Sequence, residues 1–206
     1  MRSAADFDAY YAIADPWTLE RATRRDRAVA RIVAPLVRNK SVLELGCGEG
    51  HLTATVFKDA RFIHGVDISQ VAIARAPKLR NAEFSVGDMI DVNLRGYDVV
   101  AAIECVYYLS LEERERFFAK LATELEGIFI LMAPINGGSY FTDQGLRELF
   151  SRHRLRLTHH EHVYAHRVPG TGILAAVGAR LPFVPEHFPH QFYLHDAYVI
   201  DGRQPH

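Results

Sequence analysis

A glycine-rich heptapeptide, Glu44-Leu45-Gly46-Cys47-Gly48-Glu49-Gly50, constrains the fold most strongly. It follows the apolar run SVLEL at residues 41–45 and precedes HLTATVF at residues 51–57, which has helical character. Glycine adopts positive φ angles at little cost and lets the backbone approach a ligand closely, because no Cβ stands in the way. The pattern therefore predicts a strand, a ligand-binding turn and a helix, in that order.

The rest of the chain alternates between short apolar runs and helical segments, which is typical of βαβ units on a parallel sheet. Strands are expected at RFIHGVDI, AEFSV, YDVVAAI and IFILMA, with a helix at QVAIARA. Ser110 and Glu113 form a capping-box pattern that predicts a further helix, ending before Gly127. We also expect helices near residues 142–150 and 172–181, strands near 155–164 and 192–200, and a helix from Asp15-Pro16-Trp17 to the middle thirties.

Composition narrows the classes of partner. The chain has 206 residues with 24 Lys and Arg against 25 Asp and Glu, a near balance that argues against general binding to a phosphate backbone. No apolar stretch approaches the length of a membrane span and no charged-then-apolar leader begins the sequence, so we expect a cytoplasmic protein without membrane contact. Only Cys47 and Cys105 are present, which favours reduced thiols that lie beside the site and are open to oxidation.

Asp67 indicates the kind of ligand. It ends the second expected strand, about 20 residues after Gly46, where a βαβ unit brings a carboxylate to the ribose hydroxyls of a nucleoside. The glycine spacing is G-x-G-x-G rather than the dinucleotide pattern G-x-G-x-x-G, and the acidic Glu49 would repel a pyrophosphate. Both points favour a nucleoside ligand without phosphates, although a glycine turn with no ligand remains the alternative.

These residues resemble motif I of the class I S-adenosylmethionine-dependent methyltransferases, and VDIS with Asp67 resembles their ribose-binding motif. The resemblance covers roughly residues 41–135. It implies an α/β Rossmann-like sheet of seven mostly parallel strands in the order 3-2-1-4-5-7-6, with strand 7 antiparallel and helices on both faces. It also implies that the glycine loop contacts the methionyl part of S-adenosylmethionine, that Asp67 binds the ribose, and that Ile68 and the Gly87-Asp88-Met89 turn contact adenine. The expected cofactor-binding residues are Glu44, Gly46, Cys47, Gly48, Asp67, Ile68, Asp88, Met89, Glu104 and Tyr11.

Glu104, Tyr107 and Tyr108 follow the fourth expected strand, at the switch point where such sheets open a crevice. This stretch, with Asp15-Pro16-Trp17, resembles the NodS-like branch of small-molecule methyltransferases, which implies an amine acceptor. Glu104 could orient the amine or accept its proton, and the tyrosines could wall the pocket. Alternatively, Glu104 caps a turn or holds the cofactor loop, and at least one of the two tyrosines only packs against its neighbours without a role in the pocket.

The domain organisation follows as a single methyltransferase domain over residues 1–206. Residues 1–37 are expected to form a helical lid carrying Tyr10, Tyr11 and Trp17, residues 41–135 the cofactor-binding core, and residues 136–206 the rest of the sheet and the acceptor side. The lid aromatics could surround a sulfonium or simply staple the first helix to the core. Oligomeric state is left open, with a homodimer as one alternative.

A histidine-rich segment near the C-terminal end offers a weaker candidate. On a strand, His160, His162, Tyr164 and His166 would share one face, which suggests either a metal site or a solvated edge strand, and we expect no metal.

For the whole chain, transfer of a methyl group to a small-molecule amine is the leading hypothesis. The alternatives are O- or C-methylation, a cofactor-binding protein without catalysis, and a nicotinamide enzyme.

Overall fold

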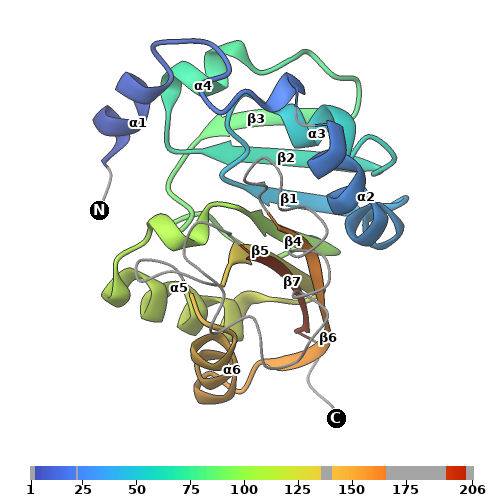
Figure 1. The fold of residues 1–206 in the computed structure, drawn as a ribbon, viewed down its shortest axis with the longest axis vertical. Helices are drawn as coiled ribbons and strands as arrows, with labels where there is room; N and C mark the ends of the chain where they lie inside the picture. Colours follow the sequence, from blue (N-terminus) through green and yellow to red (C-terminus); the bar gives the residue numbers. More distant parts are fainter. Residues whose placement is uncertain (1–2, 22, 136–140, 166–193, 203–206) are drawn as a thin grey trace.

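The computed structural model describes residues 3–21, 23–135, 141–165 and 194–202, and in these residues the chain forms one seven-stranded sheet (Figure 1). The strand order is β3-β2-β1-β4-β5-β7-β6, as predicted. The first five of these pair in parallel, and β7 runs antiparallel to both β5 and β6. The strands are β1 Ser41–Leu45, β2 Phe62–Asp67, β3 Ala82–Val86, β4 Val99–Ile103, β5 Ile128–Pro134, β6 Arg156–Ala165 and β7 Leu194–Asp201.

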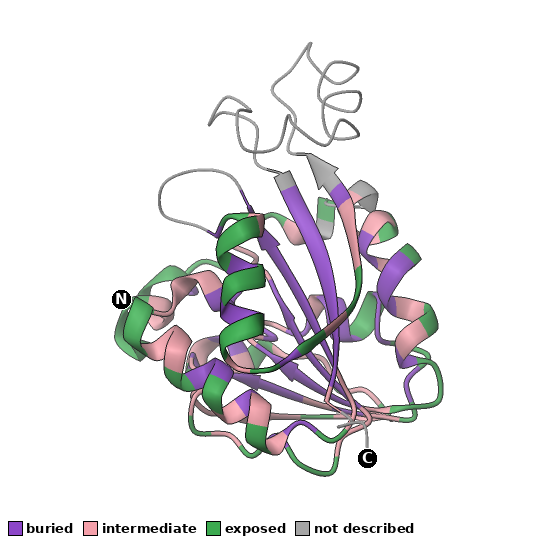
Figure 2. Cartoon of the chain, turned by 90° about the horizontal axis from the view of Figure 1, so that it is seen from below, coloured by how far each residue is buried: buried purple, intermediate pink, exposed green. Residues whose placement is uncertain are grey.

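Helices cover both faces of the sheet and create two separate cores. Alternate residues of a strand point to opposite faces, so Val42 packs beneath α2 and α3 whereas Leu43 packs beneath α5 and α6. Burial on both faces explains the near-continuous apolar runs of β1, β4 and β5, and Figure 2 shows these strands buried along most of their length. The helices are α1 Ala4–Tyr10, α2 Thr23–Val37, α3 His51–Thr55, α4 Gln70–Arg75, α5 Leu111–Glu124 and α6 Asp143–Arg152.

The predicted capping box at Ser110 and Glu113 is confirmed, and a second helix has a side-chain cap that was not predicted. Ser110 and Glu113 form a reciprocal capping box at the start of α5, because the Ser110 hydroxyl accepts from the Glu113 amide and the Glu113 carboxylate accepts from the Ser110 amide. The Thr142 side chain caps α6 by accepting from the Gly145 amide at 3.0 Å. These local contacts fix where the two helices of this face begin.

The N-terminal prediction is wrong in its detail. Asp15 does not start a long helix but lies in a turn with φ of +46°, and its carboxylate accepts from the Leu19 amide to close a single 3₁₀ turn at Leu19–Arg21. The long helix α2 begins only at Thr23 and continues through Pro35 to Val37. A separate short helix, α1, begins after a capping box of Ser3 and Asp6. The expected helix near residues 172–181 lies outside the described residues.

Among the described residues, none of the helices is both long and apolar enough to span a membrane.

Candidate cofactor and acceptor site

The glycine loop between β1 and α3 lies at the carboxyl ends of the central strands. Gly46, Gly48 and Gly50 all have positive φ, at +67°, +55° and +77°. A Cβ on Gly46 would stand 2.6 Å from the Cβ of Cys105, and one on Gly48 would stand 2.6 Å from the hydroxyl oxygen of Tyr11. Glycine is thus required here both by backbone conformation and by close packing.

Asp67 ties this loop to the end of β2. One carboxylate oxygen accepts from the Gly48 amide at 2.8 Å and the other accepts from the Ser69 amide at 2.9 Å. Burial raises the pKa of Asp67, and the two hydrogen bonds oppose that rise because they favour the charged form. The carboxylate that the sequence placed at the ribose therefore also sets the shape of the glycine loop.

Glu44 lies beneath the loop and is only 3% exposed. Its carboxyl accepts a short hydrogen bond from the Thr53 hydroxyl of α3, and burial raises its pKa to about 8. At neutral pH Glu44 is therefore mostly a neutral group that supports the loop.

The two thiols differ from the sequence expectation. Cys47 and Cys105 are buried, and burial raises both thiol pKa values well above their ordinary value. The Cys105 thiol donates to the Leu45 carbonyl at 3.2 Å between sulfur and oxygen. Because the thiolate is the reactive form, these cysteines are structural groups with low reactivity rather than sites open to oxidation.

The predicted adenine contacts come together beside Asp67. Ile68, partly exposed, follows Asp67 directly, and the turn that contains Asp88 and Met89 begins where β3 ends. This turn is fixed by a hydrogen bond from the Gly87 amide to the Asp67 carbonyl, at 2.9 Å. One Asp88 oxygen accepts from the Ile90 amide at 2.9 Å, so the carboxylate also closes its own turn, and Met89 packs on the core.

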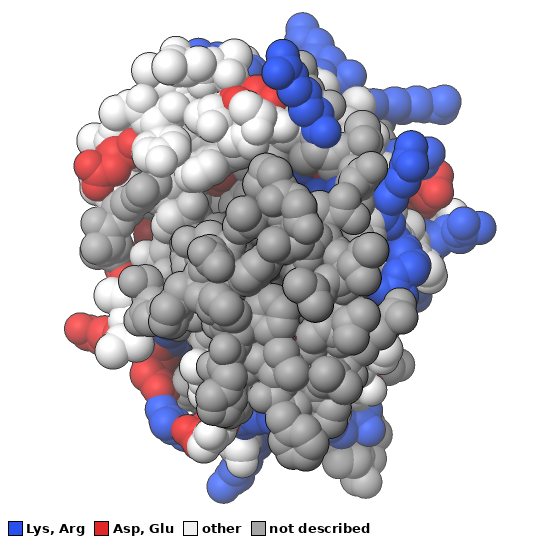
Figure 3. All heavy atoms as spheres, in the orientation of Figure 1, with Lys and Arg blue, Asp and Glu red and all other residues white. Residues whose placement is uncertain are grey.

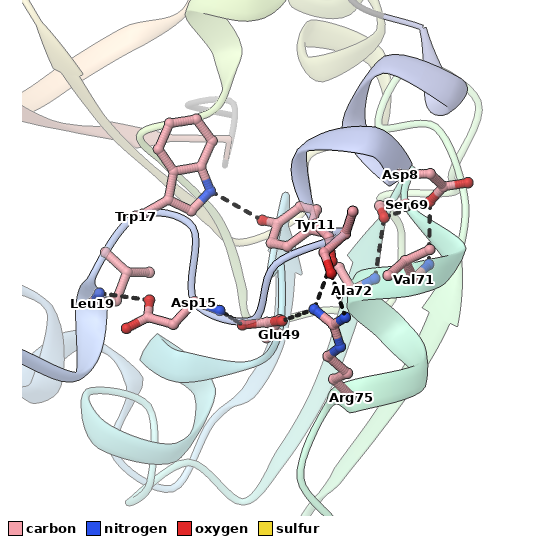
Figure 4. Close-up of polar contacts among 11 residues, drawn as sticks. Asp8, Tyr11, Asp15, Trp17, Leu19, Glu49, Ser69, Val71, Ala72 and Arg75 are labelled. Atoms are coloured by element: carbon pink, nitrogen blue, oxygen red, sulfur yellow. Dashed lines mark hydrogen bonds and ion pairs between the residues drawn. The ribbon is translucent and has the colours of Figure 1, made fainter.

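An N-terminal segment, residues 11–15, lies over the glycine loop and is held by two charged side chains (Figure 4). Arg75 of α4 donates to the Tyr11 carbonyl at 2.6 Å and to the Glu49 carboxylate at 2.9 Å. The same carboxylate accepts from the Asp15 amide at 2.9 Å. Glu49 therefore engages this segment, which supplies a structural reason for an acidic residue in the loop.

The lid and the end of β4 share an aromatic cluster. Tyr10 stacks on Trp17 with ring centroids 4.8 Å apart, and Phe7 meets Tyr108 edge to face at 5.2 Å. Trp17 donates through its indole N–H to the Tyr11 hydroxyl, with 3.4 Å between the heavy atoms. Tyr108 in turn lies 4.5 Å from Tyr107 between ring centroids. The structure thus brings the predicted lid aromatics and both tyrosines together.

Glu104, the first residue after β4, pairs with a histidine that the sequence did not single out. Its Oε1 lies 2.6 Å from Nδ1 of His195 on β7. The Glu104 amide donates to the Met132 carbonyl, which keeps its backbone on the edge of β5. The structure therefore places this carboxylate among Tyr107, His195 and the strand ends.

The histidine-rich strand β6 is not simply a solvated edge. Nε2 of His160 and Nδ1 of His162 lie 2.7 and 2.9 Å from the two carboxylate oxygens of Asp196, and both imidazoles are largely covered. Register shifts occur on either side of this pair. In the part of the chain that the structure describes, no group of three or more His, Cys, Asp or Glu side chains could hold a metal ion. His166 lies outside the described residues.

Comparison with known proteins identifies the domain. Residues 42–126, which contain the glycine loop and Asp67, match the family described as the methyltransferase domain. This part of the chain carries a methyltransferase domain, and the solved structures that share the fold include S-adenosylmethionine-dependent methyltransferases. A search of curated proteins finds no match to this methyltransferase.

Solved methyltransferases share the fold at low sequence identity. NodS, an N-methyltransferase from Bradyrhizobium japonicum WM9 in complex with S-adenosyl-L-homocysteine, has 12% identity and a TM-score of 0.72 over 98% of both chains. ChlM, the magnesium protoporphyrin IX methyltransferase of Synechocystis PCC 6803 with bound S-adenosylmethionine, has 14% identity and a TM-score of 0.69 over 98% of this chain and 97% of that one. The 1,6-didemethyltoxoflavin-N1-methyltransferase of Burkholderia thailandensis has 18% identity and a TM-score of 0.68 over 96% of this chain and 86% of that one.

Proposed function

We propose that this methyltransferase transfers a methyl group from S-adenosylmethionine to the nitrogen of a small-molecule amine. The observation that carries the proposal is the Glu104 carboxylate, which lies at the carboxyl end of β4 beside the glycine loop and is bonded to His195. A carboxylate at this edge can hold and deprotonate an ammonium group. The resemblance to the NodS-like branch, and the N-methyltransferases among the structural relatives, support the choice of nitrogen.

The cofactor half of the site fits a nucleoside without phosphates. Gly46 and Gly48 keep the loop free of side chains, and Asp67 offers its carboxylate to the ribose hydroxyls. Both Asp67 oxygens already accept one backbone N–H, but each carboxylate oxygen has two lone-pair directions and can accept a second donor. Ile68, Asp88 and Met89 would contact adenine. The shape of the glycine loop is supported by Glu44, Cys47 and Tyr11.

The acceptor half is assigned to Glu104, Tyr107 and Tyr108. Bound S-adenosylmethionine supplies an electrophilic methyl group, and the electron pair of the breaking S–C bond stays on sulfur. The acceptor nitrogen needs its own lone pair to form the new N–C bond, so it must first lose a proton, which Glu104 accepts and passes to water. The tyrosine rings close the site against the lid and limit access of water, which favours alignment for in-line transfer.

A small molecule fits the charge distribution better than a nucleic acid does. Figure 3 shows acidic side chains among the basic ones on the face that it presents, and the formal net charge of the chain is -1. Phosphate-backbone binding depends on concentrated positive charge, which this composition does not supply. The buried, reduced thiols agree with a cytoplasmic location.

A library assay tests the reaction. The enzyme is incubated with S-adenosylmethionine carrying a deuterated methyl group and with small amines, each paired with the alcohol of the same skeleton, and products are followed by mass spectrometry. We expect methylated amines and unreactive alcohols. Methylation of only the alcohols, or of carbon, would refute nitrogen transfer while leaving the methyltransferase assignment intact. Glu104→Gln should slow turnover more than it weakens cofactor binding measured by calorimetry, and the reverse ranking would make Glu104 a cofactor ligand.

A further inference from the structure

Two short turns carry predicted site residues and draw support from the same helix. The acceptor turn is the 3₁₀ turn Val106–Tyr108 together with Leu109, and the adenine turn is residues 87–92. A single turn is unfavourable on its own, because one or two hydrogen bonds must fix the backbone angles of several residues. Both turns therefore need contacts from elsewhere in the fold, and α5 supplies them.

Arg114 holds the acceptor turn. It lies at the start of α5, and because helical side chains point back toward the N-terminus, its guanidinium reaches the residues that precede the helix. Nη2 donates to the Tyr107 carbonyl at 2.8 Å and Nε donates to the Leu109 carbonyl at 3.0 Å. The guanidinium also lies over the ring of Phe141, 4.4 Å from its centroid. One planar group thus ties together two carbonyls at the end of the turn.

Lys120 holds the adenine turn. Its Nζ donates to the Ile90 carbonyl at 2.8 Å and also to the Val92 carbonyl. The Lys120 side chain is only 16% exposed, and hydrogen bonds made largely away from water are stronger. Glu124, four positions later on the same face of α5, accepts from the Leu94 amide at 3.1 Å and so fixes the chain that leaves the turn.

The two contacts act on different halves of the site. Arg114 and Lys120 are six positions apart, so they leave α5 on different sides, about 120° apart around its axis. Each donates to main-chain carbonyls and acts through the backbone of its turn. The acceptor turn carries the two tyrosines, whereas the adenine turn carries Asp88 and Met89.

We propose that Arg114 and Lys120 are positioning residues, Arg114 for the tyrosines of the acceptor half and Lys120 for the adenine contacts of the cofactor half. The inference rests on the proposed function and deepens it, because it names the side chains that hold each half in shape. Loss of either side chain should therefore impair one half and spare the other. A general structural role would instead affect both halves together.

Methionine substitutions separate the two roles, since methionine keeps an unbranched apolar side chain but donates no hydrogen bond. We expect Arg114→Met to lower kcat for the best amine of the library by about 10-fold, because a displaced wall impairs alignment, with the affinity for S-adenosylmethionine unchanged. Lys120→Met should raise the Kd for S-adenosylmethionine in calorimetry by about 3- to 10-fold, the range for one hydrogen bond, with kcat at saturating cofactor unchanged. Arg114→Lys keeps the charge but not the fork of donors, so it should show the Arg114 effect more weakly if Arg114→Met does not fold.

Arg95 provides a matched control. Its Nη2 also donates to a main-chain carbonyl, that of Thr123 in α5 at 2.8 Å, but it lies on the loop that leads into the amino end of β4, whereas the site lies at the carboxyl ends of the strands. Arg95→Met should leave both kcat and the Kd at their wild-type values. The proposal is overturned if the Arg114 and Lys120 variants affect the same quantity or neither quantity, or if Arg95→Met causes losses of the same size.

Hydrogen exchange of the unliganded protein tests the inference without either reactant. The amides to follow donate within their own turns, at Tyr108 and Leu109 in the acceptor turn and at Asp91 and Val92 in the adenine turn. We expect Arg114→Met to speed exchange of the first pair alone and Lys120→Met to speed exchange of the second pair alone. Wild-type exchange of all four amides in either variant would overturn the proposal, even if amines are methylated. The expected exchange in an enzyme that methylates no amine would refute the proposed function alone.

Discussion

Replacing Gly48 by alanine should disrupt the contact between the glycine loop and the lid. The new Cβ would lie 2.6 Å from the hydroxyl oxygen of Tyr11, and the backbone would have to keep a φ of +55° with a side chain present. The left-handed conformation costs about 1–2 kcal/mol for an L-residue. Overpacking adds about 1–3 kcal/mol, because Tyr11 is only 7% exposed and cannot move freely. The free energy of unfolding should therefore fall by about 2–5 kcal/mol.

Gly96 provides a matched control for the backbone part of this cost. It also has positive φ, at +83°, but a Cβ there would meet no atom within 4 Å. Gly96→Ala should therefore cost only the conformational part, about 1–2 kcal/mol. Urea denaturation followed by circular dichroism measures both values, and the difference between them is the steric contribution at Gly48.

A double mutant identifies the atom responsible. Tyr11→Phe removes the hydroxyl, and the next ring atom, Cζ, stands 3.5 Å from the alanine Cβ, an ordinary contact. In the Tyr11→Phe background, Gly48→Ala should therefore cost about as much as Gly96→Ala, a coupling of about 1–3 kcal/mol. If Gly48→Ala costs the same in both backgrounds, or no more than Gly96→Ala, the lid does not pack on the loop as described.

Three further perturbations test the surroundings of the loop. Asp67→Ala should weaken S-adenosylmethionine binding by about 1–3 kcal/mol in calorimetry, since it removes a charged acceptor; an unchanged affinity would exclude Asp67 as a ligand. Burial raises the pKa of Glu44 to about 8 from 4.5, so its favourable contribution to stability is complete below pH 4.5 and is lost as the pH rises through 8. Glu44→Gln should therefore be more stable relative to wild type at pH 9 than at pH 5 in urea denaturation, and an equal difference at both values would contradict a raised pKa. Arg75→Ala should speed hydrogen exchange of the backbone amides of residues 11–15, because it removes the side chain that holds this segment. The control Arg61→Ala removes only a surface ion pair and should leave this exchange unchanged. Equal exchange in the two variants would show that Arg75 does not hold the segment.

The central sheet was predictable because its signals are local. SVLEL, YDVVAAI and IFILMA are buried on both faces, so each strand shows as an apolar run without help from distant residues. The Ser110 capping box likewise needs only residues three positions apart. The order of the strands came from the resemblance to a family, since local patterns do not determine which strands pair.

The N-terminal region shows where local signals become ambiguous. An Asp followed by Pro is equally compatible with a helix start and with a turn. The outcome at Asp15 depends on Glu49, which accepts from its backbone amide across 34 positions of the sequence. From the sequence, Glu49 is expected only to repel a phosphate, because no local pattern indicates its contact with the Asp15 amide. Only the folded arrangement of α4, the loop and the lid determines it.

His195 was also missed, because its contact with Glu104 joins residues that are even further apart in the sequence. It lies 91 positions from Glu104 and belongs to no motif, and the strand that carries it follows a proline-rich stretch. The available signal was the antiparallel seventh strand implied by the family resemblance, which returns the chain to the sheet edge where β4 ends. Together with the expected position of Glu104, that strand made a contact between β7 and the end of β4 geometrically reasonable. It did not indicate which residue of β7 would make the contact.

The carboxyl groups around the crevice are balanced in four different ways. Glu44 is mostly neutral at pH 7 because burial raises its pKa, and Glu49 is matched by the positive charge of Arg75. Asp67 accepts backbone N–H groups and Glu104 pairs with a histidine, partners that stabilise a carboxylate without needing a full positive charge. Two carboxylates, Asp67 and Glu104, therefore lie at the ends of β2 and β4. Both reactants of the proposed reaction, a sulfonium and an ammonium, are cations, so charge at these two strand ends would draw them to the same crevice despite their mutual repulsion.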